Sequence, residues 1–174
     1  LRYFKEQQVE IKIISGDNPS TVSNILRQLD FEGYDRYIEG KDLPKDYNEL
    51  VEVVKEKTIF GRMTPMQKQM VIKALKENNT VGMIGDGVND ILALALADIA
   101  IAMGNGSDIA VEVGDIVLLD DSLKALNDAF MISRTTFRFI KQNLLISLFY
   151  NALTIPLAMS GYVIPLFAAI SMSM

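Results

Sequence analysis

Residues 80–90, TVGMIGDGVND, decide how this chain is expected to fold. Thr80 to Ile84 is a short, mainly apolar run, and Gly85-Asp86-Gly87 follows it directly. The run predicts a β-strand that ends in a turn, and the apolar residues between Asn89 and Ala97 predict a helix immediately after it. A strand that passes at once into a helix is the repeating unit of a parallel sheet, so this stretch predicts an α/β fold.

The same unit recurs on both sides of this stretch. Apolar runs predict further strands over residues 9–14, 58–60, 99–103 and 116–119. Helical spacing of apolar residues predicts helices over 19–30, 49–57, a segment from Pro65, and 121–140. Residues 33–47 are polar and rich in turn formers, and they predict an excursion on the surface. Strands that alternate with helices predict a doubly wound parallel sheet with flanking helices.

Two polar segments follow predicted strands and should meet at the carboxyl edge of the sheet. Ser15-Gly16-Asp17 offers a hydroxyl and backbone N–H groups for phosphoryl oxygens, although a helix N-cap is the alternative. Asp86, between two glycines, suits a hard cation beside a phosphate, although a turn with a helix cap uses the same residue types. Lys68 could offset negative charge in phosphoryl transfer, or it could be a solvated lysine.

Composition excludes several kinds of site and divides the chain. There is no Cys and no His, so disulfides, thiolate metal sites and histidine base catalysis are excluded. The formal net charge is -5, yet no charged residue follows Lys141. The 33 uncharged residues at the end predict one membrane span over residues 142–160 and the start of a second over 162–174. A buried helical hairpin of a soluble protein is the alternative.

Three longer strings carry a family resemblance: IISGDNPSTV at 13–22, FGRMTPMQKQMVIKAL at 60–75, and the run from MIGDGVND to LLDD at 83–121. They resemble the haloacid dehalogenase superfamily and, within it, the phosphorylation domain of P-type cation-transporting ATPases. The resemblance covers nearly the whole chain. It implies a Rossmann-like parallel sheet with flanking helices, followed by transmembrane helices. Residues 1–133 would then be the cytoplasmic C-terminal part of that domain, and residues 134–141 a basic juxtamembrane helix.

The resemblance also implies roles for individual residues. Mg²⁺ and ATP would be the cofactors, with Asp86 as the ligand of Mg²⁺. The residues expected in phosphoryl transfer are Ser15, Lys68, Asn89 and Asp90. The residues expected to face the nucleotide are Gly16, Asp17 and Arg62. Ser15 replaces the threonine that is commoner in these pumps but keeps the hydroxyl. The DKTGT motif with the phosphorylated aspartate is absent, so this chain is expected to be a fragment that is inactive alone.

The uncharged tail bears on the transported ion. Tyr150 and Asn151, with Met172 further on, resemble the copper-exporting, heavy-metal branch of the family, and thioether sulfur suits Cu(I). Alternatively, Asn151 supports a helix contact and Met172 faces lipid. The strings SGDNPSTV and FGRMTP, with the insert around 33–47, are more similar to pumps of the calcium or alkaline-earth type.

The function expected from this resemblance is ATP-driven export of Cu(I) or another heavy metal through an aspartyl-phosphate intermediate. The expected partners are the cation, the lipid bilayer and the rest of the pump, with no nucleic acid. The expected location is the inner membrane of a bacterial cell, with the basic cluster at Arg134, Arg138 and Lys141 on the cytoplasmic side. The alternatives are a calcium-type pump, a membrane-anchored phosphatase of the same superfamily, and a non-catalytic Mg²⁺-binding module.

Overall fold

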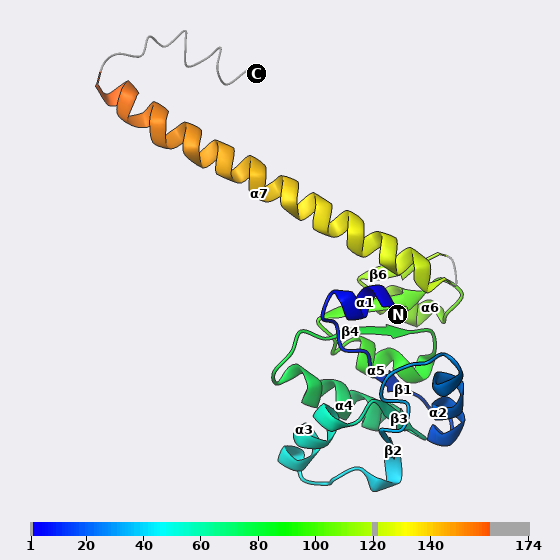
Figure 1. Ribbon diagram of the computed structural model, residues 1–174. Helices are drawn as coiled ribbons and strands as arrows, with labels where there is room; N and C mark the ends of the chain where they lie inside the picture. The colour runs from blue at the N-terminus through cyan, green and yellow to red at the C-terminus, as the bar shows by residue number, and fades with distance from the viewer. Residues whose placement is uncertain (1, 120–121, 161–174) are drawn as a thin grey trace. The chain divides into compact units, whose positions relative to one another are not determined.

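The structure is a computed structural model that describes residues 2–119 and 122–160 (Figure 1). The chain divides into two compact units, residues 1–125 and residues 126–174. The first unit contains all the strands described and every helix but the last, which begins at its end. The described part of the second unit is that single long helix.

The strands of the first unit all pair in parallel. They form two three-stranded sheets, with the orders β1-β3-β2 and β4-β5-β6. Their bounds are β1 Ile13–Ile14, β2 Tyr37–Glu39, β3 Ile59–Gly61, β4 Gly82–Gly85, β5 Ile99–Met103 and β6 Ile116–Leu118. The α/β fold with parallel pairing is therefore confirmed. The strands described are hydrogen-bonded as two sheets, however, where the sequence had predicted one.

Two strands differ from the prediction. The predicted strand over residues 9–14 shortens to the two residues of β1, because only Ile13 and Ile14 pair with β3, while Val9 and Glu10 are exposed. The surface excursion predicted over 33–47 contains β2, which the sequence reading missed. This strand has three residues, of which only Ile38 is aliphatic, and it forms because it pairs with β3, whose residues Ile59 and Phe60 are fully buried.

The helices follow the strands as predicted, with additions at the start of the chain and after β5. Their bounds are α1 Arg2–Glu6, α2 Pro19–Gln28, α3 Tyr47–Glu56, α4 Pro65–Lys76, α5 Ile91–Leu94, α6 Asp108–Val113 and α7 Leu123–Met159. Two short 3-10 helices, η1 Gly40–Asp42 and η2 Val88–Asp90, lie between them. Side chains cap four of the helices at their first turn: Asn18, Asp46, Thr64 and Ser107.

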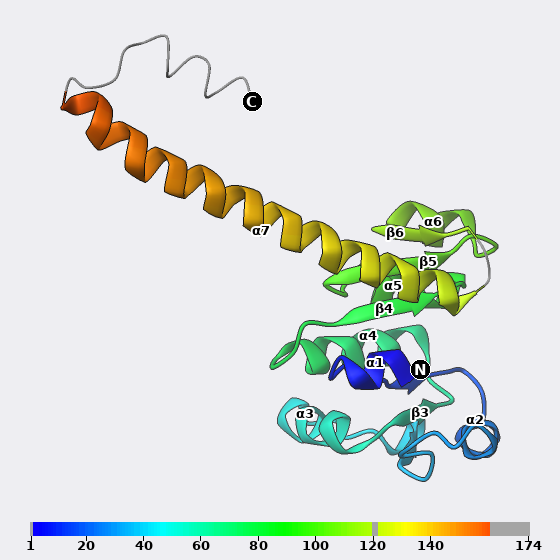
Figure 2. The same ribbon diagram turned by 45° about the horizontal axis from the view of Figure 1, so that its top comes forward.

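The core of the first unit consists of two apolar clusters that meet at α4. Figure 2 shows the ribbon of α4 between those of β4 and β3. Val71 of α4 packs with Leu50 of α3 and with Phe60 of β3. Ile72, on another face of α4, packs in the second cluster with residues of β4, α5, β5 and α6. Partly buried Ile14 of β1 and Leu75 pack against both clusters. The two sheets therefore share one continuous interior, which fixes α4 between them.

The second unit consists, as far as it is described, of helix α7. The segment predicted as an amphipathic helix and the apolar segment after it form one helix, because α7 continues without interruption through Lys141 and Pro156. Its uncharged part carries exposed large apolar side chains, among them Leu145, Phe149 and Leu153. Among the described residues, no helix is both long and apolar enough to cross a membrane. The span predicted over 142–160 is thus not shown, and residues 162–174 lie outside the described residues.

Candidate functional site

The tips of β1 and β3 are joined at their carboxyl ends. Ser15 directly follows β1, and Arg62 directly follows β3. The Arg62 N–H donates to the Asp17 carbonyl oxygen at 2.7 Å, and the Met63 N–H donates to the Ser15 carbonyl oxygen at 3.0 Å. These bonds place Ser15, Asp17 and Arg62, which the sequence assigned to phosphate and nucleotide, at one edge of the sheet.

The Ser15 hydroxyl takes part in a tight turn. Its Oγ accepts from the Asp17 N–H at 3.0 Å and lies 3.2 Å from Asp17 Oδ2, to which it donates. Gly16 lies at the top of this turn, where an added Cβ would meet nothing within 4 Å. The open space over Gly16 leaves its backbone accessible. The N-cap of α2 is Asn18, whose side chain accepts from the Ser20 N–H at 2.9 Å, so the alternative of an N-cap within Ser15-Gly16-Asp17 is wrong.

Lys68 is held in the first turns of α4 and points to η2. The N-terminus of α4 is fixed by a capping box between Thr64 and Gln67. The Lys68 ammonium lies 2.7 Å from Asp90 Oδ1, and the side chains are only 9% and 13% exposed. A solvated surface lysine is therefore the wrong interpretation of Lys68. The pair joins α4, which carries Lys68, to η2, which carries Asp90.

Asp86 occupies a turn that depends on two glycines. A Cβ at Gly85 would lie 2.8 Å from Asp90 Cβ, so the turn can close on η2 only with glycine there. A Cβ at Gly106 would lie 2.6 Å from the Asp86 carbonyl oxygen. The Ser107 N–H donates to that same oxygen at 2.9 Å. The loop at 106–107 thus holds Asp86 in place, a role that the sequence reading did not assign to it.

The exposed groups of this turn can bind a ligand from solvent. Asp86 and Asn89 are both exposed, whereas Asp90 is partly buried against Lys68. Within the described residues, no three acidic side chains come together as a complete metal site. A single carboxylate fits Mg²⁺ nevertheless, since this ion commonly takes one or two carboxylates and completes its shell with water and substrate phosphate.

Arg62 has a backbone conformation that is rare for a residue with a side chain, with φ of 50°. Its Nη1 lies 3.9 Å from Oε2 of Glu39, the last residue of β2. The same oxygen lies 3.0 Å from the Lys41 ammonium, and contact with the Glu39 carboxylate raises the pKa of Lys41. Sequence reasoning missed Glu39 because it lies in the segment predicted as a surface excursion.

Residues 1–98 match the family model described as haloacid dehalogenase-like hydrolase. The chain belongs to this family. Ser15 after β1, Lys68 on α4 after β3, and Asp86 after β4 thus lie within a haloacid dehalogenase-like hydrolase domain, and these strand ends with their neighbours Gly16, Asp17, Arg62, Asn89 and Asp90 are named the strand-tip edge.

Named relatives of this hydrolase-family chain are P-type ATPases. It is 34% identical over 167 residues to a "Probable copper-exporting P-type ATPase" of Archaeoglobus fulgidus, which is 96% of this chain and 18% of that protein. It is 42% identical over 127 residues to the "Calcium-transporting ATPase CtpE" of Mycolicibacterium smegmatis, which is 72% of this chain and 16% of that protein. The chain thus spans less than a fifth of the length of either relative.

A solved structure also resembles this hydrolase-family chain. It is the crystal structure of a zinc-transporting PIB-type ATPase, 25% identical, with a TM-score of 0.74. The match covers 98% of this chain and 24% of that one. The likeness covers nearly the whole chain and agrees with its α/β fold of parallel strands and helices.

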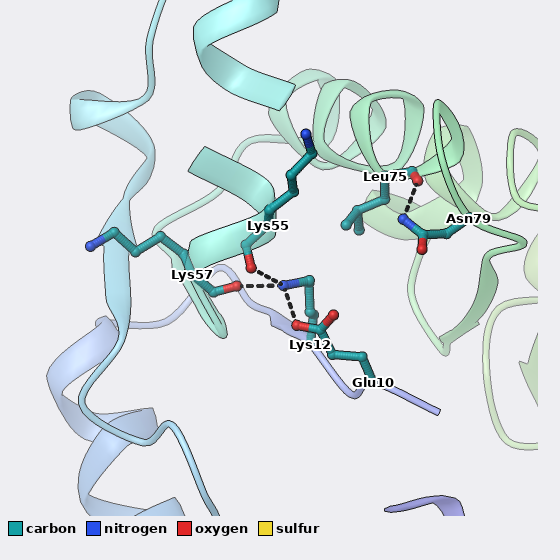
Figure 3. Close-up of polar contacts among 6 residues, drawn as sticks. All are labelled: Glu10, Lys12, Lys55, Lys57, Leu75 and Asn79. Carbon is teal, nitrogen blue, oxygen red and sulfur yellow. Dashed lines mark hydrogen bonds and ion pairs between the residues drawn. The ribbon is translucent and has the colours of Figure 1, made fainter. Parts of the chain in front are cut away.

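A second polar cluster lies at the other end of β1 in the hydrolase domain (Figure 3). The Lys12 side chain, 10% exposed, borders a cavity of about 190 Å³. Its ammonium lies 2.7 Å from Glu10 Oε1 and donates to the carbonyl oxygens of Lys57 at 2.8 Å and Lys55 at 3.4 Å. All three ammonium protons therefore have protein acceptors, and two of these are carbonyls at the C-terminus of α3. We interpret Lys12 as a helix cap, which leaves this cavity without a free ammonium for an anion.

Two of the residues predicted to bind the transported ion, Tyr150 and Asn151, lie on α7 in the second unit. The Tyr150 carbonyl oxygen accepts from the Thr154 hydroxyl at 2.9 Å, and the Asn151 side chain is exposed. Met172 lies outside the described residues. The ion-binding set therefore stays a prediction.

Proposed function

We propose that this chain is the C-terminal part of the phosphorylation domain of an ATP-driven cation pump that works through an aspartyl-phosphate intermediate. The observation that carries the proposal is the buried ion pair of Lys68 with Asp90, placed beside the exposed Asp86. A phosphoryl group bound at this edge would meet a cation fixed in direction and position. Preorganised charge of this kind stabilises the transition state of phosphoryl transfer.

Each residue of the strand-tip edge has a role in this proposal. The Ser15 hydroxyl donates a hydrogen bond to a phosphoryl oxygen, for which it exchanges its present acceptor, Asp17 Oδ2. Lys68 offsets the negative charge that develops on the transferred group, and Asp90 holds the lysine in place. Asn89 binds the phosphoryl group from the start of the helix that follows. Gly16, Asp17 and Arg62 face the nucleotide.

Asp86 is the residue proposed to bind Mg²⁺. Its carboxylate is exposed, and its backbone is fixed by the Ser107 N–H, so the carboxylate can be directed without rearrangement. Bound Mg²⁺ would supply charge neutralisation for the phosphate oxygens. The chain lacks the DKTGT nucleophile, so it is proposed to be inactive alone and to act with the remainder of the pump.

Helix α7 is proposed to connect this domain to the membrane part of the pump. Its residues 142–159 carry no charge, and Leu144, Leu148 and Phe149 are each more than 60% exposed. Apolar surface of this extent needs cover, which lipid and the other helices of an inner-membrane pump would provide. Residues 1–133 then lie on the cytoplasmic side, with Arg134, Arg138 and Lys141 between the domain and the membrane.

The proposed cargo is Cu(I). Tyr150, Asn151 and Met172 offer oxygen and thioether groups, and residues 142–174 contain no carboxylate for Ca²⁺. The match to the copper-exporting relative extends over 96% of the chain and so includes most of α7. A calcium pump is the second candidate, because the chain is 42% identical to a calcium-transporting relative over 72% of its length.

The test uses the full-length pump in lipid vesicles. We expect ATP hydrolysis to rise when Cu(I) is supplied with a reducing agent, and to show no rise with Ca²⁺. Stimulation by Ca²⁺ alone would contradict the copper assignment and support the second candidate. An absence of ATP hydrolysis with every cation tested would contradict the proposal that the chain is part of an ATP-driven pump.

A further inference from the structure

The tip of β2 lies beside the tip of β3, where Arg62 begins. The sheet register places Glu39 opposite Gly61, the residue before Arg62. The Glu39 side chain is 20% exposed, whereas the Arg62 side chain is 56% exposed. Their charged atoms are 3.9 Å apart. A largely buried carboxylate therefore lies near the guanidinium group of an arginine whose side chain is about half exposed.

The backbone of Arg62 is held in a strained conformation from several sides. A non-glycine residue with φ of 50° costs about 1 kcal/mol or more. The Arg62 N–H is fixed by the Asp17 carbonyl at 2.7 Å. Its carbonyl oxygen packs on Gly40, where a Cβ would approach to 2.7 Å, and Gln67 Nε2 donates to the Gly40 carbonyl at 2.7 Å. Strain that the surroundings maintain so completely suggests a function.

The negative charge of Glu39 argues against direct contact between this residue and a nucleotide. A carboxylate near a polyphosphate repels it, so Glu39 is a poor direct ligand for ATP. Its Oε2 atom is buried and accepts no well-aligned hydrogen bond within the described residues, while Lys41 lies 3.0 Å from it and Arg62 3.9 Å. The carboxylate thus faces two cations. Of these, only Arg62 is tied by its backbone to the strand tip that carries Ser15 and Asp17.

We propose that Glu39 is a positioning residue for Arg62. It restricts the exposed guanidinium to the orientations that reach over the carboxyl edge, and so lowers the conformational cost of binding the nucleotide. This inference rests on the proposed function, in which Arg62 contacts the nucleotide. Glu39 itself touches no substrate in this account and acts only through Arg62.

The test compares KM and kcat for ATP in the full-length pump with Glu39 and with Glu39→Gln. Removal of a carboxylate near an anionic substrate would by electrostatics alone lower the KM. If Glu39 positions Arg62, the KM rises instead, by about three- to fivefold for a pair of this exposure, and kcat stays within about twofold. Glu39→Asp, which keeps the charge on a shorter stem, should give a smaller rise. An unchanged or lowered KM in both variants would overturn the proposal.

A double-mutant cycle separates positioning from a structural role. In an Arg62→Gln background, Glu39→Gln should no longer raise the KM, since the group through which Glu39 acts is gone. Lys41→Gln breaks the other ion pair of the same carboxylate and should leave KM within about twofold. Additive effects in the cycle would overturn the proposal. Wild-type pump that hydrolyses no ATP would instead contradict the proposed function and this inference with it, which distinguishes the two failures.

Discussion

Lys68 Nζ lies 2.7 Å from Asp90 Oδ1, and these two side chains are the most enclosed ion pair among the described residues. The pair links α4 to η2, and thereby links the two halves of the candidate site. Because each charge is nearly removed from solvent, each depends on the other far more than in an exposed pair. The Lys68–Asp90 pair is therefore expected to contribute to the stability of the fold as well as to the site.

Replacement of Lys68 by Met should destabilise the chain, because it leaves the Asp90 carboxylate enclosed without its cation. We expect the free energy of unfolding to fall by about 2–4 kcal/mol, measured by urea denaturation. Lys45→Met, at an exposed lysine in a loop, is the matched control and should change it by less than about 0.5 kcal/mol. Addition of Asp90→Asn to Lys68→Met should restore part of the loss. A double variant as unstable as the sum of the single ones would contradict this account of the pair.

A methyl group at Gly106 should displace the Asp86 turn. The added Cβ would lie 2.6 Å from the Asp86 carbonyl and 2.9 Å from the Met103 carbonyl, and neither backbone atom can move alone. We expect Gly106→Ala to lower the free energy of unfolding by about 1–3 kcal/mol and to weaken Mg²⁺ binding. Gly82→Ala is the control, since its nearest contact would be 3.9 Å, at the Ile99 carbonyl. Equal stability of the two variants would show that the close approach has no energetic consequence.

Loss of the α4 cap should loosen the helix that carries Lys68. Thr64 Oγ1 accepts from the Gln67 N–H at 3.3 Å, and Gln67 Oε1 accepts from the Thr64 N–H at 3.0 Å. Thr64→Ala should therefore cost about 1 kcal/mol in the free energy of unfolding. Thr80→Ala, at an exposed threonine that caps no helix, should cost much less. Faster amide exchange confined to the first turn of α4 would locate the effect, and unchanged exchange there would argue against it.

Asp98 should make the stability of the chain depend on pH. Its carboxylate accepts from the Val81 N–H at 2.8 Å and pairs with Lys76 at 2.9 Å, and these contacts lower its pKa below the ordinary 3.8. A lowered pKa in the folded state stabilises the fold above pH 3.8, and this contribution is lost as the pH falls from there through the folded-state pKa.

The comparison of wild type with Asp98→Asn isolates this group. The difference in free energy of unfolding should be largest near neutral pH and should shrink as the pH falls below 3.8. Urea denaturation at a series of pH values measures it. A difference that stays constant over this range would mean that the folded state does not favour the charged form of Asp98.

The sequence predicted the strand β5 to the residue, Ile99–Met103, because five apolar residues between turn formers leave few alternatives. It could not predict β2, whose residues Tyr37, Ile38 and Glu39 have no apolar pattern of their own. That strand depends on the pairing energy from β3. Propensity within one segment carries no information about such a partner.

The residues of the candidate site, too, were predictable from the sequence only in part. The sequence places Ser15 and Asp86 each at the carboxyl end of a strand, and the structure confirms this for β1 and β4, although the two strands belong to different sheets. The contact of Lys68 with Asp90 joins residues that lie 22 positions apart in the chain. The residue types alone do not reveal such a pairing, so a solvated surface lysine stood as the alternative interpretation of Lys68. Glu39 and the Gly106-Ser107 loop were missed because their roles arise from packing.

The central claim is that the strand-tip edge performs Mg²⁺-dependent phosphoryl transfer in a pump. Its most direct test is the formation of acid-stable phosphoenzyme from labelled ATP by the full-length protein, with Asp86→Asn compared with Asp35→Asn at an exposed loop position. We predict that Asp86→Asn lowers the Mg²⁺-dependent label by about 100-fold, whereas Asp35→Asn retains it. Labelling of Asp86→Asn to the wild-type level at limiting Mg²⁺ would contradict the account.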